Sequence, residues 1–118
     1  MEKVGTADLW KVLSKKWALP LICQFMSRKT HRFRDLLKKL NGISSRTLTG
    51  RLREFEEAGI LSRKMYYEIP PKVEYSLTKK GEELSKIMGK IENLAIKWRK
   101  NRIKQFQNGG TSLNISLL

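Results

Sequence analysis

The chain has 118 residues and a formal net charge of +14, from 25 lysines and arginines against 11 acidic residues. Its length predicts one domain with a modest core and leaves no room for a second, catalytic domain. The charge predicts a polyanionic partner, either nucleic acid or an acidic membrane surface.

Membrane insertion and secretion are not expected. The longest apolar stretch, Trp17 to Cys23, is far shorter than the ~20 residues that span a bilayer, and residues 1–10 lack a signal-peptide pattern. The one cysteine, Cys23, cannot form a disulfide within the chain and suits a reducing compartment. We therefore expect a cytoplasmic protein that does not enter the membrane.

Apolar residues at helical spacing predict two helices near the start of the chain. The first stripe consists of Leu9, Trp10, Leu13 and Trp17. A second helix is expected from about Trp17 to Met26, with Pro20 in its first turn, where the missing N–H costs little. The basic run from Arg28 to Arg34 then indicates a loop with room for a short strand.

A helix, a tight turn and a second helix follow. The first of these helices is expected to turn inward Phe33, Leu36, Leu37 and Leu40. It ends at Asn41-Gly42, a pair that favours a left-handed helix stop. The second runs from Ser44, a strong N-cap residue, to Ala58 and stops before Gly59. Its buried stripe consists of Leu48, Leu52 and Phe55. The pattern predicts a helix-turn-helix.

Two segments with period-two alternation come next and predict a β-hairpin. They run from Leu61 to Tyr67 and from Val73 to Leu77. Pro70-Pro71 is placed in the connecting tip, because proline cannot join a sheet ladder. A two-stranded ribbon after a helix-turn-helix is a wing, so the predicted fold class is mostly α with a small β wing (α+β).

A long last helix is predicted to begin near Thr78. Its apolar residues are spaced 3, 4, 3, 4, which is typical of a coiled-coil seam; they are Leu84, Ile87, Ile91, Leu94 and Trp98. The expected domain covers residues 1–107, including both terminal helices, and residues 108–118 are expected to form a flexible tail.

The second helix of the helix-turn-helix carries the side chains best suited to touch DNA. With Leu48 at the centre of its buried face, a step of about 100° per residue turns Arg46 and Arg53 outward. Thr47 and Thr49 lie on the flanks. Arginine and hydroxyl side chains reach base edges and phosphates.

The basic run before this helix extends the same surface. Nine lysines and arginines and one acidic residue lie within residues 28–53. Lys72 at the wing tip is a candidate for a backbone or minor-groove contact. The expected DNA-binding residues are Arg28, Lys29, Arg32, Arg34, Ser44, Ser45, Arg46, Thr47, Thr49, Arg51, Arg53 and Lys72.

Several of these strings together resemble the HxlR family of winged-helix regulators. The most specific are Lys16-Trp17, Arg32-Phe33, the run Gly42-Ile43-Ser44 with Leu48-Thr49 and Arg51-Leu52, and PPKVEYSLT from Pro70 to Thr78. The resemblance covers roughly residues 9–98. It implies a homodimeric repressor or activator of transcription that binds double-stranded DNA.

The resemblance also implies a dimer interface formed by the first and last helices. The residues expected there are Leu9, Trp10, Leu13, Leu84, Ile87, Ile91, Leu94 and Trp98. Family members that sense oxidants carry a cysteine near the N-terminus, and residues 1–8 contain none. Cys23 is expected to act as a small buried hydrophobe. The resemblance leaves an unidentified small-molecule effector open.

The same residues bear on other classes of function. An enzyme is not expected, because one histidine, one cysteine and no phosphate-binding glycine loop cannot assemble a nucleophile–base pair or a metal cluster. No cofactor is expected either. His31, in the basic run, is predicted to lie on the surface. A sequence-non-specific architectural DNA-binding protein and a winged-helix protein-interaction module remain alternatives.

Overall fold

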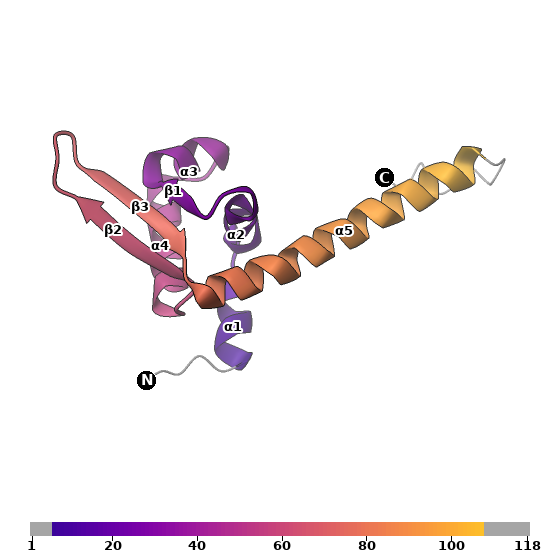
Figure 1. Cartoon of the computed structure of the whole chain (residues 1–118), viewed down its shortest axis with the longest axis horizontal. Coiled ribbons are helices and arrows are strands. Elements are labelled where there is room, and N and C mark those ends of the chain that lie inside the picture. Colours follow the sequence, from indigo (N-terminus) through magenta and orange to yellow (C-terminus); the bar gives the residue numbers. More distant parts are fainter. Residues whose placement is uncertain (1–5, 108–118) are drawn as a thin grey trace. The chain divides into compact units, whose positions relative to one another are not determined.

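The computed structural model describes residues 6–107 and contains five helices and three strands in that range (Figure 1). In chain order they are α1 (Thr6–Leu13), α2 (Ala18–Ser27), β1 (Thr30–Arg32), α3 (Phe33–Lys39), α4 (Ser45–Glu57), β2 (Leu61–Tyr66), β3 (Lys72–Leu77) and α5 (Lys79–Gln107). The chain divides into two compact units, residues 1–86 and residues 87–118. The predicted flexible tail lies outside the described residues.

The first unit contains an antiparallel three-stranded sheet in the order β1-β3-β2. The predicted hairpin is confirmed as β2 and β3, which pair from Leu61 opposite Leu77 to Tyr66 opposite Lys72. A third strand, β1, lies in the basic run, where the sequence left room for a short strand, and it pairs with the other edge of β3. The base of the wing is therefore anchored to the segment between α2 and α3.

Alternation in β2 does not correspond to a buried face along its whole length. Leu61 is buried, but Met65 and Tyr67 are exposed. The outer half of the hairpin is only partly covered, since Tyr66 and Val73 are half-buried there. Which residues of a two-stranded ribbon are buried depends on what packs against it, and the alternation of residue types along a strand does not show where such packing occurs.

The core of the first unit is formed by the helix faces that the sequence predicts. Leu48, Leu52 and Phe55 of α4 are fully buried, together with Leu36 of α3. Further buried apolar side chains are Ala18, Leu21, Ile22, Phe25, Leu40, Ile43, Ile60, Leu61, Tyr75 and Leu77. Two predicted inward residues of α3, Phe33 and Leu37, are only half-buried.

His31 is buried, and the prediction that it lies on the surface is wrong. Its side chain is 1% exposed and packs edge-on against Phe25, with ring centroids 4.7 Å apart. The reason is its place in β1 opposite Tyr75, which turns the imidazole toward the core. Nε2 lies 3.1 Å from the carbonyl oxygen of Arg28. Burial lowers the pKa of His31, and the charges of Lys39 and Arg28 add to this effect.

The predicted helix boundaries are confirmed by their capping contacts. Ser44 Oγ accepts a hydrogen bond from the backbone N–H of Thr47 at 3.0 Å, which makes Ser44 the N-cap of α4. Gly42 and Gly59 adopt φ of 99° and 78°, so each ends its helix in the left-handed region. Thr78 caps α5 by accepting the N–H of Gly81 at 3.1 Å.

The corner between α1 and α2 differs from the prediction. Helix α1 ends at Leu13, so Trp17 does not continue its stripe. Trp17 instead has φ of 77°, a left-handed conformation that is uncommon outside glycine, and precedes α2. A methyl group at Gly42 would lie 3.8 Å from the Trp17 ring, so the indole packs beside the α3–α4 turn.

The second unit, described to residue 107, is the continuation of α5. Met88 is buried, but most of its larger apolar side chains are exposed in the single chain; these are Ile87, Ile91, Leu94, Ile96, Trp98, Ile103 and Phe106. Basic residues alternate with them, among them five between Lys97 and Lys104. No helix within residues 6–107 is long and apolar enough to span a membrane.

Candidate nucleic-acid interface

Helix α4 presents a polar face to solvent from its first residue onward. Ser45, Arg46, Thr49 and Arg53 are all exposed, whereas the opposite face is buried in the core. Thr49 Oγ1 donates to the carbonyl oxygen of Ser45 at 2.8 Å. The geometry expected for a recognition helix is therefore present, and we use that name for α4.

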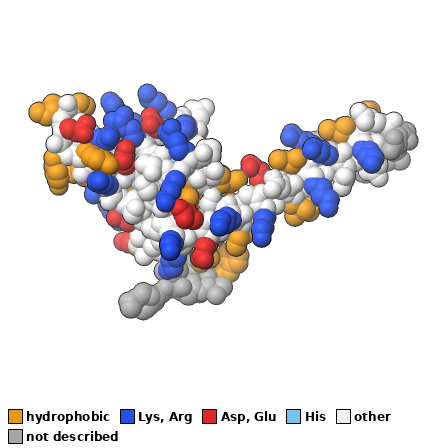
Figure 2. All heavy atoms as spheres, in the orientation of Figure 1, with side chains coloured by type: hydrophobic (Ala, Val, Ile, Leu, Met, Phe, Trp, Pro, Cys, Tyr) orange, Lys and Arg blue, Asp and Glu red, His pale blue; other side chains and the backbone are white. Residues whose placement is uncertain are grey.

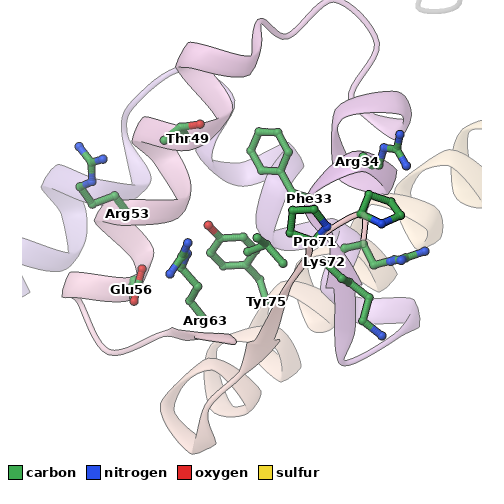
Figure 3. A pocket seen from close by; sticks show the side chains of 12 residues that line it. Phe33, Arg34, Thr49, Arg53, Glu56, Arg63, Pro71, Lys72 and Tyr75 are labelled. Atoms are coloured by element: carbon green, nitrogen blue, oxygen red, sulfur yellow. The ribbon is translucent and has the colours of Figure 1, made fainter. Parts of the chain in front are cut away.

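A cleft of about 730 Å³ lies between the recognition helix, the start of α3 and the hairpin (Figure 3). Five of the predicted DNA-binding residues line it, namely Arg32, Arg34, Thr49, Arg53 and Lys72. Phe33 and Tyr75 are aromatic members of the lining, and Pro70 and Pro71 of the wing tip also line the cleft. The three elements thus contribute to one continuous surface.

The charge of this cleft is strongly positive. Its lining holds four arginines and one lysine but one acidic residue, Glu56. Figure 2 shows lysine and arginine side chains gathered over the α3 region of the same unit. Several cations around a groove with few acids concentrate a positive potential that attracts a polyanion.

Arg63 is a member of this cluster that the sequence prediction missed. It lies in β2 directly opposite Tyr75 of β3, so both side chains point to the same face of the sheet. In Figure 3 it lies beside Tyr75 and toward Arg53 and Glu56 of the recognition helix. The alternation of β2 places Arg63 on the same face as Leu61 and Met65, which the sequence predicts to be apolar. A charged arginine on an apolar face was the one sequence feature that could have marked Arg63 as a binding residue.

Other predicted residues lie outside the cleft, some of them with partners in the chain. Lys29 pairs with Glu82 at 2.8 Å, and Arg28 Nε donates to the carbonyl oxygen of Thr30 at 3.2 Å. The hydrogen bond and the positive charge of Lys29 lower the pKa of Glu82. Ser44, Ser45, Arg46 and Thr47 form the first turn of the recognition helix, and the structure does not place them in the cleft.

Lys72 lines the cleft and also interacts with other residues of the wing. Its Nζ lies 3.6 Å from Glu74 Oε2 and 4.3 Å from the centre of the Tyr66 ring. The ammonium group is thereby held over the hairpin, at the edge of the basic surface.

Arg51 is placed differently from every other predicted DNA contact. Its Nη1 pairs with Glu54 at 3.0 Å, and its Nε donates to the carbonyl oxygen of Lys16 at 2.8 Å. The guanidinium group is directed toward the α1–α2 corner, on the flank of the helix that does not line the cleft. The guanidinium group of Arg51 is therefore engaged within the chain, and its contact with DNA stays a prediction.

The residues predicted for the dimer interface fall into two groups. Trp10 and four seam residues of α5 are exposed in the single chain and available to a partner; the seam residues are Ile87, Ile91, Leu94 and Trp98. Leu9 and Leu84 are half-buried. Leu13 is only 9% exposed, so its side chain belongs to the core of the single chain, and its place in the interface stays a prediction.

Residues 6–107 contain a second cleft but no cluster of metal-ligating side chains. Within residues 6–107, no group of three or more histidine, cysteine, aspartate or glutamate side chains could hold a metal ion. A second cleft of about 440 Å³ lies between α1 and the end of the recognition helix. Its lining mixes both charges, with Lys11 and Lys15 beside Glu54 and Glu57.

Helix-turn-helix, antiparallel hairpin and a basic surface that joins them define a winged helix-turn-helix protein. The profile of the family described as HxlR-like helix-turn-helix matches residues 12–103. The chain belongs to this family of transcriptional regulators, which is a family of DNA-binding proteins and not of enzymes.

Named relatives and solved structures agree with this assignment. A helix-turn-helix-type transcriptional regulator of Synechocystis, sll1512, is 40% identical over 87 residues, which are 74% of this chain and 64% of that protein. YvaP of Bacillus subtilis, of the same type, is 37% identical over 74% of this chain and 80% of its own length. A structure described as a MarR-family regulator from Enterococcus faecalis V583 matches with a TM-score of 0.71 and 30% identity, over 88% of this chain and 94% of that one.

The coverage differs between the relatives. The chain spans less than two thirds of the length of sll1512 and most of the length of YvaP.

Proposed function

We propose that this protein binds double-stranded DNA in a sequence-specific manner as a homodimer and thereby regulates transcription. The observation that carries the proposal is the continuous basic surface formed by the exposed side of the recognition helix and the cleft beside the hairpin. A helix with this exposure fits the major groove, and the hairpin next to it reaches the flanking backbone or minor groove.

The proposed roles follow from side-chain type and position. Arg46 and Arg53 would read base edges, because arginine bonds guanine through two donors and both side chains are exposed on the recognition helix. Thr47 and Thr49 would contact bases or phosphates from its flanks. The arginines of α3 and β2, together with Lys72, would hold phosphates on either side of the groove.

The proposed dimer rests on the exposed seam of α5. Ile91 is 55% exposed and Trp98 61% exposed, and both lie in a 3, 4, 3, 4 pattern that would be covered by a second copy of the helix. A two-fold dimer would place its recognition helices roughly 34 Å apart, which matches successive major grooves on one face of B-DNA.

The test begins with duplexes that the wild-type protein selects from a random pool. Fluorescence anisotropy would compare a selected duplex with a scrambled duplex of equal length at several salt concentrations. Preference by a factor of about 10³ or more is expected for a specific regulator. Failure of the pool to converge, with a steep salt slope, would favour an architectural phosphate-binding protein. Absence of binding to any duplex would refute DNA binding.

A further inference from the structure

The α1–α2 corner, residues 14–17, contacts the helix-turn-helix at two places. The first is a polar network. Glu54 of the recognition helix lies 2.6 Å from Lys15 Nζ through Oε2 and 3.0 Å from Arg51 Nη1 through Oε1. Arg51 Nε closes the network by donating to the carbonyl oxygen of Lys16 at 2.8 Å. We call these four residues the corner clamp.

The second contact lies on the turn before the recognition helix. The Trp17 ring packs beside Gly42, which occupies the left-handed region and fixes the direction of the chain into Ser44. The corner therefore touches the turn through Trp17 and the middle of the recognition helix through the clamp. Because one contact lies on the turn before the recognition helix and the other at the middle of the helix, the two together restrict both the rotation of the helix and its distance from the corner.

The direction of the Arg51 side chain separates it from the DNA-facing arginine next to it in the helix. Residues two apart on an α-helix differ by about 200° around its axis, so Arg51 and Arg53 point to opposite flanks. Arg53 lines the basic cleft, whereas the Arg51 side chain is 20% exposed and spends two donors on the corner. The donors of the Arg51 guanidinium group are therefore used by partners within the chain, and the planar group is held in one orientation.

We infer that Arg51 is a positioning residue, which orients the recognition helix through the corner clamp and influences DNA binding without contacting DNA. The inference rests on the proposed function, since it concerns how the DNA-binding helix is held. It makes the corner next to α1 a structural partner of the recognition helix.

The lowered pKa of Glu54 agrees with its place in the corner clamp. Burial acts to raise the pKa of Glu54, but the hydrogen bond from Lys15 and the charges of Arg51 and Lys15 outweigh it and hold that pKa below its usual value. The carboxylate is therefore charged at neutral pH, and its two oxygens accept from two different cations. Neutralising it would weaken both ion pairs at once.

The test uses Arg51→Met, Arg51→Lys and Glu54→Gln, with Glu57→Gln as the matched control. Glu57 is an exposed acid on the same helix, and the described structure gives it no ion pair. Removing an acid from a DNA-binding helix normally favours binding, because it reduces repulsion of phosphates. The clamp predicts the opposite for Glu54→Gln, a loss of affinity for the selected duplex, and predicts no loss for Glu57→Gln.

The arginine variants separate positioning from phosphate contact. Both should weaken binding roughly tenfold, and the double variant Arg51→Met/Glu54→Gln should be little worse than Arg51→Met alone, because both changes break the same network. Arg51→Lys keeps the charge, but its single ammonium nitrogen replaces the two separate nitrogens, Nε and Nη1, that reach the Lys16 carbonyl and Glu54. The salt slope of each variant should equal that of the wild type, whereas loss of a phosphate contact would lower it by about one.

Three results would overturn the inference. These are a lowered salt slope for Arg51→Met, full rescue by Arg51→Lys, and unchanged affinity in all three variants. Circular dichroism and thermal unfolding restrict the comparison to variants that fold. If the wild type itself binds no selected duplex, the proposed function fails, and coupling between Arg51→Met and Glu54→Gln in urea unfolding then tests the clamp alone.

Discussion

The buried imidazole of His31 connects one residue to the stability of the winged domain. Its Nδ1 is buried without a hydrogen-bond partner among the described residues, and its ring packs on Phe25 in the core beneath β3. Burial and the nearby cations Lys39 and Arg28 lower its pKa from the usual 6.5. The neutral ring is therefore the form that the folded chain accommodates.

This arrangement predicts that the fold loses stability in mild acid. Below about pH 6.5 the unfolded chain binds a proton that the folded chain resists, so the free energy of unfolding should fall as the pH drops toward the lowered pKa of His31. Above pH 6.5 the contribution is fully present. Urea unfolding between pH 5.5 and 8 would measure the trend.

A histidine variant provides the control for this prediction. His31 is the only histidine of the chain, so His31→Gln should flatten the pH dependence in that range. An equally steep dependence in the variant would assign the effect to other groups.

Arg63 yields a prediction at the same scale. Arg63→Met should weaken binding to a selected duplex and lower the salt slope by about one, if the guanidinium holds a phosphate. Lys64→Met removes the same charge from the opposite face of β2, and it should have the smaller effect. Equal losses in the two variants would show that Arg63 acts only through net charge.

Two glycines within helices show that the surroundings of a position determine how a side chain added there would change the stability of the fold. A Cβ at Gly50 would meet no described atom within 4 Å, whereas a Cβ at Gly81 would collide with the carbonyl oxygen of Ile60. Gly81 also donates to Thr78 at the first turn of α5, where the helix leaves the sheet. The fold therefore does not require glycine at position 50, whereas close packing requires it at position 81.

Opposite effects are therefore expected from two identical substitutions. Gly50→Ala should stabilise the fold by about 1 kcal/mol through helix propensity, and Gly81→Ala should destabilise it by about 1–3 kcal/mol through overpacking. Thermal or urea unfolding measures both. Stabilisation by Gly81→Ala would contradict the packing described here, and weaker DNA binding by Gly50→Ala would indicate close approach of DNA to the backbone at Gly50.

Elements were predictable from the sequence where local chemistry determines them. Ser44, Gly59 and Thr78 mark helix ends through caps that need only neighbouring residues, and the stripe of the recognition helix follows from its period. Strand β1 and the burial of His31 depend on pairing with β3, which is more than 40 residues away in sequence. Long-range pairing leaves little local signal.

The same distinction applies to the basic surface. Arg53 could be predicted because the helical period shows which way it points. The contacts of Arg51 could not be predicted, because its partners are a backbone carbonyl and Glu54, and the carbonyl belongs to a corner that no local pattern describes. Arg63 enters the cleft only because the register of β2 and β3 turns it there.

At the scale of the whole molecule, the exposed seam of α5 predicts how the chain assembles. Ile91→Asp would place a charge in the middle of the seam and should convert the dimer to a monomer with much weaker DNA binding. Asn93→Asp adds the same charge to an exposed position off the seam and should leave the dimer intact. Light scattering would measure the masses, and a dimeric Ile91→Asp would locate the interface elsewhere.

Hydroxyl-radical footprinting on a selected duplex tests the central claim most directly, because it maps where two recognition helices lie on DNA. The account predicts two protected segments, related by two-fold symmetry, whose centres are about 10 base pairs apart. Arg46→Ala should weaken both segments equally, since one residue in each subunit serves each half-site. A single protected segment, or even protection along the duplex, would contradict a homodimer that reads two major-groove half-sites.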